Sequence, residues 1–393
     1  MKVLDFTHHI AGPYCTKILA DYGADVIKIE KPGGGDPARR MGPFPGDVPD
    51  PEKSGFFLHL NTNKRSVTLN LKSETGRKIC LELARDADVV VENFRPGVMA
   101  SFGLDYPVLE KINPRLVMAS ISNFGQTGPY RDFKSSELVL SAMGGGMPSG
   151  WEDREPLKYA GSVRQYQSGL LAVNGVLAAF YASRWHGVGQ YLDLSMFEMH
   201  ISNLDNRAGS LIRYQFTGNK MQRQSAARRS AYPPMGAYPC ADGYIFWFPV
   251  PQWNVVANLL KRPDLLKDPR FATPEARVEH GAEFDEIFLE WSLQRTKKQC
   301  WEEAIAAGMI CGPCNTVEEL YDDPHVRGRG FWSEVEHPAM GKVAIPGRPV
   351  VMTKTPWQVR RPAPLLGEHN EEVLGKLGYS REDLVILRET GVI

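Results

Sequence analysis

The fold is decided by residues 2–30, KVLDFTHHIAGPYCTKILADYGADVIKIE. Apolar runs at Lys2–Phe6 and Ala24–Glu30 predict strands, and the apolar spacing over Pro13–Tyr22 predicts a helix between them. A helix that joins two strands is typical of a parallel sheet, because parallel neighbours need a crossover connection. This stretch therefore predicts the first unit of an α/β domain.

The same alternation continues through the first third of the chain. Three more runs rich in apolar residues predict strands at Ser66–Leu71, Asp88–Glu92 and Leu116–Ser122. Helical spacing covers Glu74–Arg85 and Val98–Ile112. Together these elements predict an α/β fold with a Rossmann-like, doubly wound parallel sheet.

A long helix is predicted over Gly169–Arg184. It is apolar nearly all round and rich in small residues, so we expect it to be buried. Further along, Asp242-Gly243 predicts a hairpin turn within residues 237–248.

Changes in composition divide the chain into domains. We expect residues 1–205 to form the first part of a large domain and 206–224 an exposed, basic linker. Residues 225–325 should form a smaller α+β domain, and 326–393 a return linker and the C-terminal part of the large domain.

Composition excludes several classes of function. Lys+Arg and Asp+Glu both number 46, so no bulk charge suggests nucleic acid as a partner. No apolar run reaches the roughly 18 residues of a membrane span, and no signal peptide precedes the first strand. Six scattered cysteines indicate a reduced, cytoplasmic protein, and Cys311-Gly-Pro-Cys314 predicts a turn rather than a redox or metal site.

Motifs in order along the chain resemble a known family. They are ADYGADVIKIEKPGGGD (20–36), DVVVENFRPG (88–97), GQTGPY (125–130), GSVRQYQSG (161–169) and LGEHN (366–370). Each is weak alone, but together they span nearly the whole chain and resemble the class III CoA-transferases, the formyl-CoA and carnitine-CoA transferase family. The resemblance implies an interlocked dimer, in which each chain threads through the other.

The reacting position of that family is altered in this sequence. In those enzymes an aspartate four residues before the glycine matching Gly169 attacks an acyl-CoA thioester, and here Gln165 takes its place. An amide is too weak a nucleophile to form the acyl anhydride that the transfer needs. Glu137 matches an acidic residue close to that aspartate, although a role as a surface or helix-capping carboxylate would explain it equally well.

The resemblance also implies a path for CoA, which is a substrate and not a permanently bound cofactor. The residues that it places along CoA are Ala11, Gly12, Pro13, Tyr14, Lys31, Asn93, Phe94 and Lys134. From the residues themselves, the Gly33–Gly35 turn and the cations Lys31, Arg39 and Arg40 suit phosphate groups. A structural turn and solvated charges are the alternative interpretation.

Other departures from the family bear on activity. Ser101 replaces an arginine that relatives often have, which predicts weak CoA binding. Pro233-Pro234 follows Tyr232, where a glycine-rich loop shields intermediates in formyl-CoA transferases. The related 2-methylacyl-CoA racemases need a histidine where this chain has Ser136, and His8 and His9, which lack a paired base, are interpreted as structural.

Three functions remain open on the sequence. In the first, the chain is the aspartate-lacking subunit of a heteromeric member, such as the succinyl-CoA:benzylsuccinate CoA-transferase, and its partner is a homologue with the aspartate. CoA would then move from an acyl-CoA, expected to be succinyl-CoA, to a carboxylic acid such as an aromatic succinate. The aromatic stretch 244–253 would suit an aromatic acid. The alternatives are a self-sufficient homodimer that uses Glu137 and a CoA-binding protein without catalysis.

Overall fold

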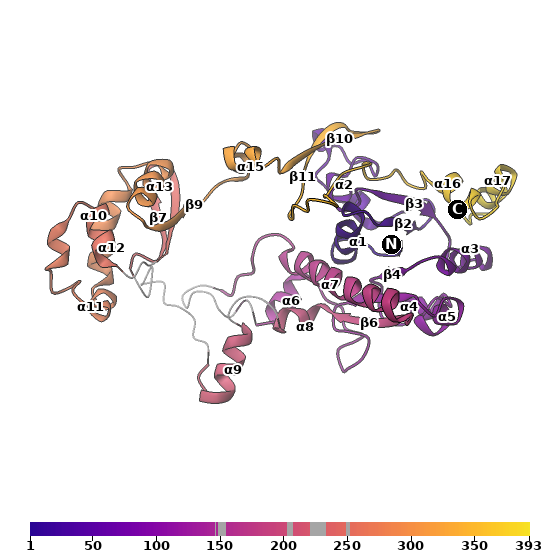
Figure 1. The fold of residues 1–393 in the computed structure, drawn as a ribbon, viewed down its shortest axis with the longest axis horizontal. Helices are drawn as coiled ribbons and strands as arrows, with labels where there is room; N and C mark the ends of the chain where they lie inside the picture. Colours follow the sequence, from indigo (N-terminus) through magenta and orange to yellow (C-terminus); the bar gives the residue numbers. More distant parts are fainter. Residues whose placement is uncertain (146, 148–154, 203–206, 221–232, 249–251) are drawn as a thin grey trace. The chain divides into compact units, whose positions relative to one another are not determined.

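The computed structural model describes residues 1–145, 147, 155–202, 207–220, 233–248 and 252–393 (Figure 1). The chain forms two compact units, each with its own core. The first comprises residues 1–148, 157–220 and 328–393, and the second 149–156 and 221–327.

The first unit is built on a six-stranded parallel sheet with the order β3-β2-β1-β4-β5-β6. Its strands are β1 (Lys2–Asp5), β2 (Asp25–Glu30), β3 (Lys64–Thr68), β4 (Val89–Glu92), β5 (Val117–Ser122) and β6 (Gln190–Ser195). This order reverses at β1 and β4, as in a doubly wound sheet. The predicted fold class is confirmed. The sequence analysis placed the first five strands and missed β6, which carries the exposed Tyr191 and Asp193 at the edge of the sheet.

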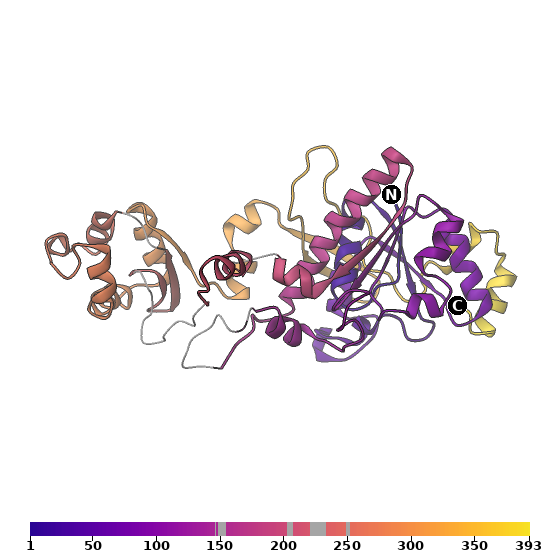
Figure 2. The same ribbon diagram turned by 90° about the horizontal axis from the view of Figure 1, so that it is seen from below.

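Helices cover both faces of this sheet (Figure 2). One face packs against α1 (Ala11–Asp21), α6 (Glu137–Met143), α7 (Val163–His186) and α8 (Met196–Ser202). The other packs against α3 (Glu74–Arg85), α4 (Val98–Ser101), α5 (Tyr106–Ile112), α16 (Asn370–Gly375) and α17 (Arg381–Glu389). The last two helices bring the C-terminus of the chain back to the first unit (Figure 1).

Two glycines allow α1 to approach its neighbours closely. A Cβ at Gly169 would lie 2.5 Å from the backbone oxygen of Ala11, and a Cβ at Gly12 would lie 2.3 Å from the side chain of Thr7. Neither position tolerates a side chain without movement of the backbone or of a buried group. The glycine that marks the family motif thus brings α7 against the start of α1.

The prediction that α7 is buried all round is wrong for the single chain. Its buried side includes Ala172, Val176 and Ala179, whereas Tyr181 and Trp185 are 62% and 72% exposed. Both faces of α7 are therefore apolar, but only one of them is covered within the single chain.

The return segment is fixed to the first unit by a polar side chain at the start of β3. The Asn63 side chain accepts the amide of Arg360 at 2.6 Å and donates to the carbonyl of Gln358 at 2.7 Å. The indole of Trp357 donates to Asp21 at 3.0 Å. The other elements of this unit are η1 (Pro37–Arg40), η2 (Pro45–Asp47), α2 (Gly55–Leu60), α9 (Arg207–Thr217), β10 (Trp332–His337) and β11 (Gly341–Pro346).

Helix α9 occupies most of the predicted linker, and its described side chains are exposed or half-buried. Residues 218–220 of that linker are also described, whereas residues 206 and 221–224 lie outside the described residues.

The second unit has a three-stranded antiparallel sheet with the order β7-β8-β9. The predicted hairpin is confirmed, since Cys240 pairs with Gly243 across the turn. The unit's elements are β7 (Gly236–Cys240), β8 (Gly243–Phe248), α10 (Trp253–Leu259), η4 (Pro263–Leu266), α11 (Pro274–Glu279), α12 (Gly281–Ser292), α13 (Lys297–Ala306), β9 (Ile310–Pro313) and α14 (Val317–Tyr321), with α15 (Pro324–Gly328) at its end. None of the described helices of the chain is long and apolar enough to cross a membrane.

Candidate functional site

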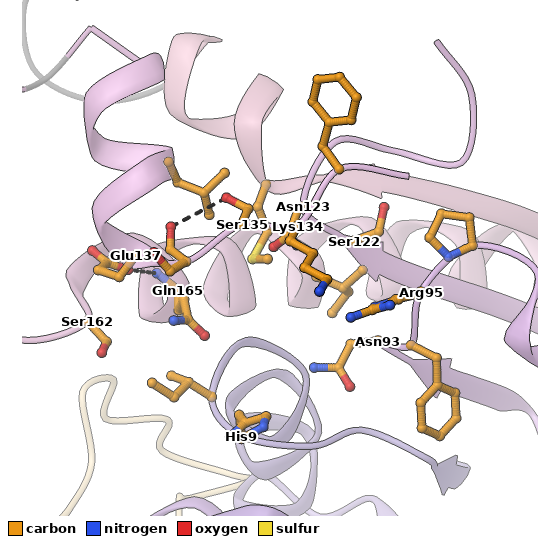
Figure 3. A pocket seen from close by; sticks show the side chains of 18 of the residues that line it. His9, Asn93, Arg95, Ser122, Asn123, Lys134, Ser135, Glu137, Ser162 and Gln165 are labelled. Atoms are coloured by element: carbon orange, nitrogen blue, oxygen red, sulfur yellow. Dashed lines mark hydrogen bonds between the residues drawn. The ribbon is translucent and has the colours of Figure 1, made fainter. Parts of the chain in front are cut away.

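Gln165 lies in the first turn of α7, one helical turn before Gly169. Residues four apart share a face of a helix, so Gln165 lies on the side of α7 that meets α1 at Ala11. Its side chain lines a cavity of about 670 Å³ (Figure 3). Most of the other walls come from the segments that follow β1, β4 and β5, including His9, Asn93, Phe94, Arg95, Ser122, Asn123 and residues 131–137.

Glu137 caps the helix that carries Gln165. Its carboxylate accepts the backbone amides of Arg164 at 2.9 Å and Gln165 at 3.2 Å. Ser162, the residue that precedes α7, makes no capping hydrogen bond with its own side chain. Glu137, which itself begins α6, therefore supplies the negative charge that the N-terminus of a helix favours.

Cations dominate the wall opposite Gln165. Figure 3 shows the side chains of Lys134 and Arg95 converging above Asn93. Neither makes an ion pair with any residue that the structure describes. The only other carboxylate among the described lining residues, Asp132, has a side chain that is 76% exposed and lies 3.5 Å from Arg131. The cavity is thus suited to an anion and has no carboxylate at the position of Gln165.

A second cavity of about 400 Å³ shares one wall with the first. Phe94 lines both cavities, and its ring contacts His8 at 5.3 Å and Phe102 at 6.4 Å between centroids. The remaining lining residues are mostly apolar, with Lys31 and Lys72 as the cations. Lys72 and Phe102 were missed in the sequence analysis, because neither lies in a motif and only the fold brings β3 and α4 beside β2.

The structure groups the predicted CoA residues in part. Lys31, Asn93, Phe94 and Lys134 line one or both cavities. Ala11, Gly12 and Pro13 are buried in the first turn of α1, and Tyr14 packs on Tyr166 with 4.9 Å between ring centroids. The contact with CoA that the resemblance implies for these four stays a prediction.

Arg39 is corrected by the structure. We expected this guanidinium to bind phosphate, but it is 1% exposed and bonds to Glu30 through two nitrogens at 2.9 and 2.8 Å. Its third nitrogen bonds to Glu52 at 2.8 Å. With a fourth bond to the carbonyl of Pro364, the buried guanidinium uses four of its five N–H groups within the fold, so Arg39 stabilises the fold instead.

The glycine turn is also structural. We expected the amides of Gly33–Gly35 to face phosphate, but those of Gly34 and Gly35 bond to the carbonyl of Lys31 at 3.3 and 2.9 Å. A Cβ at Gly35 would lie 2.9 Å from the carboxylate of Glu30. The turn therefore needs glycine to pass over the Glu30–Arg39 pair, and Arg40 bonds back to Gly34.

Two fully buried lysines hold the segment after β1 in place. Lys64 pairs with Asp5 at 2.9 Å and also donates to the carbonyl of Pro13. Lys28 pairs with Asp36 at 2.9 Å and donates to the carbonyl of Thr7. Although burial opposes ionisation, the charges of Lys64 and Lys28 hold the pKa of Asp5 well below its usual range.

His8 and His9 are held by backbone contacts. Asn93 clamps His8, since its side chain accepts the amide and donates to the carbonyl of that residue, both at 2.8 Å. Burial and the charge of Lys28 lower the pKa of His8. The amide of His9 donates to Asp36 at 3.1 Å, and the residue takes a φ of +64°.

The remaining predicted features lie away from the first cavity or have structural contacts. Ser136 caps α6 through the amide of Val139. Pro233-Pro234 forms a turn before β7 in the second unit, and Tyr232 lies outside the described residues. Cys311 and Cys314 are both free thiols. Among the described residues, no group of three His, Cys, Asp or Glu could hold a metal ion.

Comparison with known proteins identifies relatives of the chain. The chain is 38% identical to a formyl-CoA:oxalate CoA-transferase of Streptomyces avermitilis, over 100% of this chain and 98% of the relative. It is 34% identical to a succinate–glutarate CoA-transferase of Agrobacterium fabrum (96% and 94% covered) and 33% identical to a succinyl-CoA–D-citramalate CoA-transferase of Chloroflexus aurantiacus (100% and 97%).

Solved structures show the same architecture. A CAIB/BAIF family protein from Brucella suis matches with a TM-score of 0.85 and 31% identity, over 96% of this chain and 98% of that one. Rv3272 of Mycobacterium tuberculosis matches with a TM-score of 0.80 and 29% identity, over 94% and 96%. Residues 1–370 match CoA-transferase family III. The chain therefore belongs to the CoA-transferase family III.

Proposed function

We propose that this chain is the nucleophile-lacking subunit of a heteromeric CoA-transferase, and that a homologous subunit with an aspartate supplies the covalent step. The observation that carries this proposal is the placement of Gln165. Its amide lines the cavity at the N-terminus of α7, where a family III enzyme needs a carboxylate. An amide neither ionises nor attacks a thioester at a useful rate.

Glu137 is poorly placed to replace the missing aspartate. Its carboxylate already accepts two amides of the first turn of α7. Attack on a thioester would convert it to a neutral anhydride and weaken the cap of the helix that forms the site. A self-sufficient homodimer would therefore use as its nucleophile a carboxylate that its own fold needs as the cap of α7.

The two cavities suggest how an acyl-CoA would bind. We place the adenine in the second cavity, against Phe94 and Phe102, with Lys31 and Lys72 near the phosphates of CoA. The pantetheine chain would pass Phe94, which is common to both cavities, and reach Lys134 and the thioester end beside Gln165. Lys72 offers a charge that compensates in part for Ser101, which is exposed on α4.

The acyl group is proposed to be a dicarboxylic acid, with succinyl-CoA as the donor. Two relatives are named for succinate or succinyl-CoA. Arg95 and Lys134, which make no ion pair with a described residue, would donate hydrogen bonds to the second carboxylate of such an acid. For the acceptor we keep the proposal of an aromatic succinate, since β8 exposes Tyr244, Phe246 and Phe248 while its Ile245 and Trp247 are buried.

The uncovered face of α7 supports a partner subunit. Four large apolar side chains, Leu170, Leu177, Tyr181 and Trp185, are each between 44% and 72% exposed along that face. The rings of Tyr181 and Trp185 stack at 5.5 Å. Such a continuous apolar face is typical of a permanent interface. We propose that it packs in an interlocked dimer with the aspartate-bearing homologue, in the cytoplasm, where the six free cysteines would stay reduced.

The test compares the chain alone with the chain co-expressed with an aspartate-bearing homologue. Each preparation is incubated with succinyl-CoA and a free acid, treated with borohydride or hydroxylamine, and analysed by mass spectrometry for covalent adducts. We expect activity only in the co-expressed complex and an adduct only on the homologue. Gln165→Asp in the isolated chain should not give near-native rates, because Pro233-Pro234 stands where relatives have a mobile loop.

Other outcomes point to the alternatives. An adduct on Glu137 of the isolated chain would indicate a self-sufficient homodimer. Stoichiometric CoA binding without exchange in either preparation would indicate a binding protein without catalysis.

A further inference from the structure

A row of polar side chains crosses three neighbouring strands at the edge of the sheet that carries the first cavity. Glu92 on β4 is the register partner of Ser120 on β5, and Ser120 is the partner of Asp193 on β6. Register partners project from the same face of a sheet. The hydroxyl of Ser120 hydrogen-bonds to the carboxylate of Glu92, which is 4% exposed.

Each end of this row holds a segment that lines the cavity. The carboxylate of Glu92 accepts the backbone amide of Phe94 at 2.7 Å. The carboxylate of Asp193 accepts the amide of Gln126 with both oxygens at 3.0 Å. The first segment carries Phe94, the wall between the two cavities, and the second leads to Lys134.

We propose that Glu92 is a positioning residue for acyl-CoA. Its carboxylate fixes the backbone of Phe94 at the junction of the two cavities, and the strength of that hold changes when the carboxylate gains or loses a proton. The inference rests on the proposed binding of CoA in these cavities and deepens it. Glu92 itself lines neither cavity, so it acts through Phe94 and not by touching the ligand.

The surroundings of Glu92 keep the titration of its carboxyl group in the physiological pH range. Burial raises the pKa of Glu92 to about 7, and the charge of Asp193 adds to that effect. The other groups that face it are neutral: Ser120 on β5 and Tyr191 on β6, whose hydroxyl has a pKa raised by burial. On the far side of the Phe94 ring lies His8, whose pKa is lowered by burial and which is therefore also uncharged near neutrality.

Ionisation strengthens the contact with Phe94. A carboxylate accepts an N–H more strongly than a protonated carboxyl group does, because the hydrogen bond is charge-assisted. At pH 8 the ionised form would dominate and hold Phe94 firmly, whereas at pH 6 the neutral form would hold it weakly. Glutamine at position 92 copies the shape and charge of the neutral form at every pH.

The experiment measures the dissociation constant of CoA by calorimetry from pH 6 to pH 8.5, for the wild type and Glu92→Gln. The ratio of the two constants at each pH cancels the titration of CoA itself. We expect a ratio near one at pH 6 and weaker binding by the variant of about fivefold at pH 8. Glu110→Gln, which removes an exposed carboxylate on α5, serves as the control and should match the wild type throughout.

The Ser120→Ala variant provides a second test of the inference. It removes the hydroxyl that stabilises the ionised carboxylate, so the midpoint of the wild-type pH profile should move to higher pH. A Glu92→Gln ratio that is the same at all pH values, or an unmoved midpoint in Ser120→Ala, would overturn the inference. Failure of the wild type to bind CoA at any pH would instead overturn the proposed function, and the inference with it.

Discussion

Replacing Gly169 with alanine should destabilise the protein, although alanine is the better helix former. The new Cβ would lie 2.5 Å from the backbone oxygen of Ala11 and 3.3 Å from Cβ of Tyr14. Because the closest atom belongs to the backbone of α1, the two helices must move apart by about 1 Å to reach ordinary contact. Overpacking of this kind costs about 1–3 kcal/mol and helix propensity returns about 1 kcal/mol. We expect a net loss of up to about 2 kcal/mol in the free energy of unfolding.

Gly175 offers a matched control in the same helix. A Cβ there would lie 3.9 Å from methyl groups of Leu192 and Leu194, which is ordinary van der Waals contact. Gly175→Ala should therefore stabilise the protein by about 0.5–1 kcal/mol through helix propensity. Because the gain in helix propensity is common to both alanine variants, their free energies of unfolding should differ by the overpacking cost alone, about 1–3 kcal/mol, with Gly169→Ala the less stable.

Urea unfolding followed by circular dichroism measures this difference, with the slope of the free energy against urea as a check that the unfolded states are alike. Gln165 lies one turn ahead of Gly169, so CoA binding should weaken in Gly169→Ala and stay unchanged in Gly175→Ala. If Gly169→Ala is as stable as Gly175→Ala, then α1 can move without cost. The close approach of the two helices would then not be what requires glycine in the family motif.

Three further predictions concern buried charge and capping. Burial raises the pKa of Glu92 from 4.5 to about 7, so ionisation of this carboxyl group destabilises the wild type as the pH rises through that window. The stability of Glu92→Gln relative to the wild type should therefore increase by about 2–3 kcal/mol between pH 5 and pH 8. Urea titrations at both pH values check this, and an offset independent of pH would contradict it. Glu137→Ala should cost about 1–2 kcal/mol and speed hydrogen exchange at the first-turn amides of α7, with Glu137→Gln milder; unchanged exchange would show that the cap is dispensable. Lys64→Met should cost about 3–5 kcal/mol by leaving Asp5 buried and unpaired, and adding Asp5→Asn should recover much of the loss, as thermal unfolding of both variants would reveal.

The sequence contained enough information to predict strands β1 to β5 of the sheet, but not the edge strand β6. Strands β1, β2, β4 and β5 contain short apolar runs and are largely buried, and β3 overlaps the apolar run at 66–71; such runs are recognisable without tertiary knowledge. Strand β6 alternates polar and apolar residues, with Tyr191 and Asp193 exposed at the edge, so it lacked that signal. Helix α7 misled in the opposite way, because its exposed apolar face looks like a core face in the sequence.

Site residues were predicted correctly where a residue type serves one purpose. They were predicted incorrectly where the residue type can serve either ligand binding or the fold. Gln165 was assigned to the reacting position through the family motif around Gly169, and the structure has it in the wall of the first cavity. Arg39 was assigned to phosphate because nothing in the sequence shows that Glu30 and Glu52 surround it in the fold. The buried lysines of β2 and β3 were missed for the same reason, since lysine within a strand usually marks a solvent-facing position and only the fold supplies their carboxylate partners.

The structural demands around position 165 also explain how an amide can occupy that position while the surrounding fold is kept. Gly12 and Gly169 are required by the contact of α1 with α7, Glu137 by the open end of α7, and Lys64 by the charge of Asp5. Each of these residues stabilises the fold of this chain whether or not any chemistry follows. The side chain at position 165 is different, because it faces the cavity and closes no contact in the core. Exchange of a carboxylate for an amide there would remove the covalent step and leave the walls in place. A subunit that must shape a shared site and cover its partner would thus retain every feature described here except the one group that reacts.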